Sequence, residues 1–128
     1  MVHFFLYLLG HSLVVSQFLS LTSLDSGVNA SFRGLSVVNN SVVWVSGTGG
    51  TVLRTVDGGA NWENVSVPNM DKTDFRDVEG FDKNTAIVMG IASPARFYKT
   101  TDRGQNWKLV YFDDREEVFF DGMSFWNK

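Results

Sequence analysis

The feature that most constrains this chain of 128 residues is an internal repeat. Residues 32–38 align with residues 75–81 at an offset of 43, and residues 55–62 align with residues 100–107 at an offset of 45. A third unit opens near residue 120, where a Phe-x-Gly segment again follows its counterpart by 45 positions. A fixed period of this length indicates that the chain stacks copies of one supersecondary unit against each other.

Each unit is predicted to contain four short strands and no helix, because no window shows a sustained apolar period of 3.6 residues. The continuously apolar runs at 42–45 and 86–89 indicate strands that are covered on both faces. Asn39 and Asn40 predict a two-residue hairpin turn, since asparagine tolerates positive φ. The expected strands are at about 32–38, 41–47, 51–55 and 62–67 in the first unit, and at about 75–81, 84–90, 95–100 and 107–112 in the second.

Four strands in every 43–45 residues, with both faces buried, is typical of a β-propeller blade. The predicted fold class is therefore all-β: a β-propeller fragment with blade one at about 32–67, blade two at about 75–112, and the first strand of a third blade at about 119–126. Closed propellers contain about 4–8 blades. We thus expect missing blades or self-association to complete the ring. A small β-sandwich would explain the strands but not the repeated motif.

The first 24 residues differ in composition from the rest of the chain. They contain no Asp, Glu, Lys or Arg, and they include apolar runs at 4–9 and 13–15. Such short, interrupted runs suit a signal-peptide core better than a bilayer span of about 20 residues, although a basic leading segment is missing. We expect an exported protein, periplasmic or secreted, that meets a membrane only through this segment, with residues 25–128 forming the partial propeller. A retained anchor and a buried N-terminal strand are the alternatives.

Composition excludes several functions. The net charge of −3 gives no electrostatic attraction to a phosphate backbone, so no nucleic-acid partner is expected. The chain has no cysteine and two histidines, His3 and His11, which leaves little material for a metal site or a His-based triad. No metal and no cofactor are therefore predicted. A glycosidase needs two carboxyl groups at a defined separation, and the spacing of Asp77, Glu79 and Asp121 does not pair them. No catalytic residue is predicted.

One motif, Thr-x-Asp-x-Gly-x-Asn-Trp, occurs at the same place in both units. Its physical chemistry suits a turn: aspartate accepts bonds from nearby backbone N–H groups, glycine permits a left-handed backbone, and tryptophan anchors the next strand. We therefore assign a structural role to its members, which are Thr55, Asp57, Gly59 and Trp62 in the first unit and Thr100, Asp102, Gly104 and Trp107 in the second.

This motif resembles the Asp-box, or BNR repeat. The segments at 31–35, 43–47, 51–55 and 97–101 are in addition similar to the photosystem II stability and assembly factor family and to its exported bacterial relatives. The resemblance covers about residues 28–128. It implies a non-enzymatic propeller that acts as a binding or assembly scaffold. One alternative is a fragment of a sialidase-like Asp-box glycoside hydrolase whose catalytic residues lie outside this chain, and another is a purely structural fragment.

Arg33 and Arg76 are the candidate binding residues. Both open the first strand of their unit, directly after a phenylalanine, and the third unit has Asp121 at that position. Propellers bind ligands at the rim of the central channel, so two stacked guanidinium groups there predict a site for a protein or an anionic ligand. The alternative is an ion pair between blades. Asp77 and Glu79 offer Arg76 nearby acids, whereas Gly34 and Ser36 stand at those places in the first unit, which favours a ligand role for Arg33.

Overall fold

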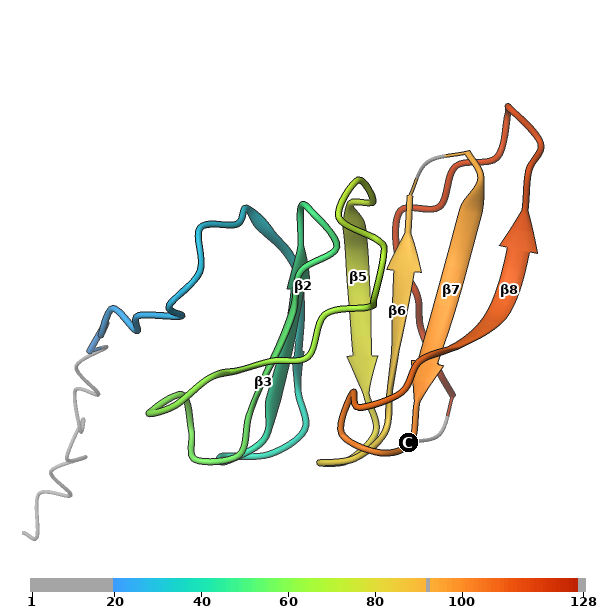
Figure 1. The fold of residues 1–128 in the computed structure, drawn as a ribbon. Coiled ribbons are helices and arrows are strands. Elements are labelled where there is room, and N and C mark those ends of the chain that lie inside the picture. Colours follow the sequence, from blue (N-terminus) through green and yellow to red (C-terminus); the bar gives the residue numbers. More distant parts are fainter. Residues whose placement is uncertain (1–19, 92, 127–128) are drawn as a thin grey trace, which may run out of the picture.

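The computed structural model describes residues 20–91 and 93–126, which form two four-stranded antiparallel sheets (Figure 1). In each sheet the strand order follows the chain, so each sheet is a simple meander. The predicted all-β class and the two four-stranded units are confirmed. The strands are β1 (Phe32–Val37), β2 (Val43–Gly47), β3 (Val52–Thr55) and β4 (Glu63–Asn64) in the first sheet, and β5 (Phe75–Gly80), β6 (Ala86–Gly90), β7 (Ala95–Thr100) and β8 (Lys108–Asp113) in the second.

Residues 1–19, which make up most of the predicted export segment and include both histidines, lie outside the described residues. Within the part that the structure describes, no helix is long and apolar enough to cross a membrane.

The core lies between the two sheets, because β5 packs across the faces of both β1 and β2 (Figure 1). Trp44 on β2 and Phe75 on β5 are completely buried there. Gly80 faces the Trp44 ring so closely that a β-carbon would not fit, and the indole Nε1 of Trp44 donates to the carbonyl of Asp82 at 3.0 Å. The core side chains are Val42, Trp44, Val52, Val67, Phe75, Val78, Ala86 and Val88.

The two sheets bury equivalent positions to very different extents. Val78 on β5 faces the first sheet and is 2% exposed, whereas its counterpart Leu35 on β1 is 66% exposed. Val37 on β1 is also largely exposed, while its counterpart Gly80 is buried. The outer face of β1 therefore has the sequence of an interface between blades but no sheet packed against it in the described residues.

The turn between β1 and β2 differs from the prediction. The side-chain Oδ1 of Asn39 accepts hydrogen bonds from the backbone N–H groups of Ser41 and Val42, both at 2.9 Å, and the Val38 N–H bonds to the Val42 carbonyl. Neither Asn39 nor Asn40 has a positive φ. The prediction of a two-residue turn was wrong, because the asparagine side chain closes a longer loop and removes the need for a left-handed backbone.

Strand β4 is also shorter than predicted, since it covers two residues where the sequence indicates 62–67. The side chain of Asn64 accepts bonds from the backbone N–H and hydroxyl groups of Ser66 at 3.1 and 2.6 Å. The Ser66 hydroxyl in turn accepts the N–H of Val52 at 3.0 Å. The backbone N–H of Val65 still donates to the Val52 carbonyl at 2.9 Å, so side-chain bonds supplement this backbone bond at this end of the sheet.

Residues 119–126 run along the second sheet without forming a strand. The backbone N–H of Met123 donates to Oδ2 of Asp77 at 2.7 Å, and the ring of Phe125 packs edge-on against Phe81 at 5.0 Å between centroids. The structure therefore does not contain the strand predicted at about 119–126. A first strand pairs with the second strand of its own blade, as β1 does with β2, and residues 119–126 have no such partner strand among the described residues.

Candidate functional site

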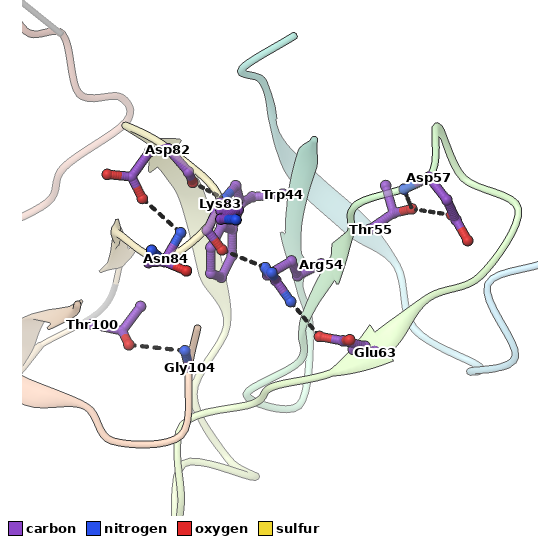
Figure 2. Close-up of polar contacts among 10 residues, drawn as sticks. All are labelled: Trp44, Arg54, Thr55, Asp57, Glu63, Asp82, Lys83, Asn84, Thr100 and Gly104. Atoms are coloured by element: carbon purple, nitrogen blue, oxygen red, sulfur yellow. Dashed lines mark hydrogen bonds and ion pairs between the residues drawn. The ribbon is translucent and has the colours of Figure 1, made fainter. Parts of the chain in front are cut away.

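The Asp-box turns connect the third and fourth strands of each sheet (Figure 2). In the first turn, the buried hydroxyl of Thr55 donates to Oδ1 of Asp57 at 2.8 Å and accepts the Gly59 N–H at 3.0 Å. Asp57 also accepts the backbone and side-chain N–H groups of Asn61 at 2.9 and 2.8 Å. The same network, with distances of 2.7–2.9 Å, recurs among Thr100, Asp102, Gly104 and Asn106.

These hydrogen bonds make the Asp-box carboxylates stronger acids than free aspartate. The side-chain amide of Asn61, followed by its backbone N–H and the Thr55 hydroxyl, lowers the pKa of Asp57 to about 2. The pKa of Asp102 is lowered for the same reason, with the Asn106 side chain as the main cause. The asparagines that replace the usual threonine of the motif thus contribute directly to the turn. In the described residues both carboxylates bond only to groups of their own turn.

The motif tryptophans differ in one respect. Nε1 of Trp107 donates to the carbonyl of Val65 in the first blade at 2.9 Å, whereas Nε1 of Trp62 is buried and has no acceptor within residues 20–91 and 93–126. Leu24 lies over Gly59 as Val65 lies over the equivalent glycine of the second turn. The Trp107 bond therefore links one blade to the next, and Trp62 lacks the matching partner on its own preceding side.

The two candidate arginines each approach an acid of the following unit. Nη2 of Arg33 lies 3.9 Å from Oδ2 of Asp74, with the two side chains 37% and 40% exposed. Nη2 of Arg76 lies 2.6 Å from Oδ1 of Asp121, and the Arg76 side chain is 34% exposed. The expectation that Arg33 lacks a nearby acid was therefore wrong, and the salt bridge of Arg76 is formed with Asp121 and not with the expected Asp77 or Glu79. Both acids belong to the segment that opens the following unit, so the spacing of residues within one unit does not reveal these two ion pairs.

The acids considered for catalysis make separate contacts. Asp77 accepts the N–H groups of Val78 and of residue 123, and Glu79 accepts the Ser36 hydroxyl at 3.2 Å. Asp121 pairs with Arg76. In the part of the chain that the structure describes, no group of three or more His, Cys, Asp or Glu residues can hold a metal ion.

Sequence reasoning missed a buried arginine. The Arg54 side chain is 4% exposed, and its Nε donates to the carbonyl of Lys83 at 2.6 Å while Nη1 pairs with Glu63 (Figure 2). Its guanidinium also lies 5.7 Å from the centre of the Trp44 ring, within the range of a cation–π interaction. The only sequence signal for this role is a charge inside the otherwise apolar third strand.

Comparison with known families decides the assignment. The family model of the photosynthesis system II assembly factor YCF48 matches residues 16–116. The chain belongs to this family. The predicted resemblance is thereby confirmed, and the two sheets are two blades of a partial β-propeller.

A solved structure described as "YCF48 bound to D1 peptide" has the same fold, with a TM-score of 0.59 and 24% sequence identity. The match covers 73% of this chain and 30% of that one, so this chain spans under a third of the length of the YCF48 structure. Comparison with curated proteins returns no match.

Proposed function

We propose that this chain is a non-enzymatic propeller unit that binds a peptide segment of a partner protein and acts in assembly. Membership of the YCF48 family supports this proposal, and so does the D1 peptide named for the YCF48 structure of the same fold. The observation that carries it is the loose ion pair between Arg33 and Asp74, which holds a guanidinium at the surface without a close partner.

The geometry of this pair leaves Arg33 available to a ligand. A separation of 3.9 Å is beyond hydrogen-bond distance, and both side chains are more than one-third exposed. Ion pairs of this kind contribute at most about 1 kcal/mol. A carboxylate of an incoming peptide can therefore replace Asp74 at little cost and form the bidentate bonds that guanidinium groups favour. Arg76, at 2.6 Å from Asp121, has a tighter partner to displace.

The proposal is tested by titrating the full chain with overlapping D1 peptides and following fluorescence anisotropy. We expect Arg33→Gln to weaken binding about two- to fivefold with little change in melting temperature, the range for one exposed charge contact. Asp74→Asn is the matched variant: it removes the competing acid, so it should strengthen binding. Loss of stability in Arg33→Gln with binding unchanged would instead assign Arg33 a structural role.

Export through the N-terminal segment is a separate part of the proposal. It is supported by the charge-free apolar composition of residues 1–24 and by the family match, which begins at residue 16 and thus follows most of that segment. Mass spectrometry of the mature protein in secreted and cell fractions tests it. An intact N-terminus in the cell fraction alone would contradict export.

A further inference from the structure

We propose a second binding site, for an acidic peptide, in the groove between the two blades at the end of the sheets opposite Arg33. The groove has a volume of 1180 Å³. Residues 63–66 of the first blade form one wall, and residues 101–105 of the second Asp-box form the other, with Lys83 and Asn84 beside them. The sheets pack through β1, β2 and β5. The two walls touch where Val65 lies over Gly104 and its carbonyl accepts the Nε1–H of Trp107, and the groove lies beside this contact.

A strained backbone at Arg103 points to this groove. Arg103 has a φ of 69°, in the left-handed region that glycine adopts freely and other residues adopt with strain. Its counterpart in the first Asp-box is Gly58, with a φ of 71°. The hydrogen bond from the Arg103 N–H to the Asn84 carbonyl, 2.9 Å long, helps to hold this conformation. The turn thus accommodates glycine in one unit, yet the other unit carries an arginine that lines the groove. Strain retained in this way indicates a functional use of the side chain.

The charges that line the groove leave two cations available. Lys83 and Arg103 are exposed, and within the described ranges neither side chain forms a salt bridge or a hydrogen bond, while Lys83 also interacts electrostatically with the neighbouring carboxylate of Asp82. The groove also holds two acids: Glu63 pairs with the buried Arg54, and Asp102 accepts hydrogen bonds from neutral groups of its own turn and keeps its negative charge. The cations Arg54, Lys83 and Arg103 outnumber these two acids, so the lining carries a net positive charge although the chain as a whole is acidic.

The remaining lining favours a peptide as the ligand. Asn64, Ser66, Thr101 and Gln105 bring amide and hydroxyl groups that can both donate to and accept from a peptide backbone. The groove also runs beside β4, which is the last strand of its sheet. An extended chain bearing glutamate or aspartate side chains fits this combination of cations and neutral polar groups.

This site is independent of the proposed Arg33 site. Arg33 lies near the start of β1, as its counterpart Arg76 lies near the start of β5, and Lys83 of the groove follows the end of β5. The two surfaces therefore lie at opposite ends of the sheets. Variants in one site therefore test it without disturbing the other.

The decisive variant is Arg103→Gly, which removes the cation and also restores the residue that the first unit uses. The probe is a fluorescein-labelled hexaglutamate peptide, titrated into the full chain at low ionic strength, with hexaglutamine as the neutral reference. We expect Arg103→Gly to weaken hexaglutamate binding about two- to fivefold while the melting temperature stays the same or rises. Lys83→Gln should weaken binding by a similar factor, and Arg103→Lys should retain it.

Lys108→Gln is the matched control, because Lys108 is an exposed cation that does not line the groove. Lys108→Gln should leave hexaglutamate binding unchanged. Equal binding by wild type and Arg103→Gly, equal losses in Lys108→Gln, or equal affinity for hexaglutamine would each overturn the proposal. A lower melting temperature in Arg103→Gly would show that the arginine stabilises the turn and would also overturn it.

Discussion

The replacement of Thr55 by valine is the sharpest test of how the Asp-box holds a blade together. Thr55 is 1% exposed, and its hydroxyl accepts the N–H of Gly59 at 3.0 Å and donates to Asp57 at 2.8 Å. Valine keeps the shape of the side chain, so no cavity is created. The change therefore removes the hydroxyl alone.

The expected cost follows from the burial of the groups left behind. Gly59 is buried, and its N–H would lose its acceptor, which costs about 1–3 kcal/mol. The N–H of the exposed Asp57 can bond to water and adds little. For a domain of roughly 100 residues, a loss of about 2 kcal/mol lowers the melting temperature by about 8–16 °C. Thr100→Val should cost the same or less, because Gly104 is only partly buried.

The free energy of unfolding is measured by urea titration with tryptophan fluorescence, at a protein concentration where sedimentation shows one species. Thr101→Val is the control, since Thr101 is exposed and its hydroxyl makes no hydrogen bond to any described residue; it should stay within about 0.5 kcal/mol of wild type. If Thr55→Val unfolded with the wild-type free energy, the hydroxyl would not be what secures the turn.

Three further outcomes are expected. The pKa of Asp57 lies at about 2, below its usual 3.8, so the folded state is stabilised by the ionised carboxylate. This stabilisation should be complete above about pH 4 and be lost as the pH falls toward 2. Melting temperatures of Asp57→Asn should lack this pH dependence. Trp107→Phe should cost about 0.5–1.5 kcal/mol more than Trp62→Phe in urea titrations, since of these two indoles only that of Trp107 has an acceptor among the described residues; equal costs would contradict this reasoning. The exposed face of β1 should make the chain associate, and Leu35→Lys with Val37→Lys should shift sedimentation toward monomer; a wild type that is monomeric at all concentrations would refute this.

The predictions that held concern contacts between residues close in sequence. The strands were found because apolar runs and the repeat period mark them directly. The Asp-box geometry was predictable because its hydrogen bonds join residues two to four positions apart, as in Thr55–Asp57 and Asp57–Asn61. There are two exceptions. Strand β4 is shorter than predicted where Asn64 and Ser66 bond through their side chains. At the turn, Asn39 could close the loop through its backbone φ or through its side chain, and the sequence did not distinguish the two.

The predictions that failed concern contacts between blades. Arg33 and Arg76 were correctly located on the first strands, but their acid partners come from the following unit. Arg54 meets the Lys83 carbonyl 29 residues away. Which of these groups meet depends on the angle and register between two sheets, and no motif within a single unit encodes that.

By itself the sequence determined the all-β class, the division into two blades and the chemistry of the Asp-box turns, because each of these depends on periodicity or on bonds within a few residues. Only the tertiary structure decided that Arg54 is buried against Trp44, that Arg33 faces Asp74 across the blade boundary, and that Arg103 lines a cationic groove. The physical reason is that charged side chains have no preferred partner along the chain. Whether a charged side chain is buried, paired or exposed depends on which surfaces the tertiary packing brings together.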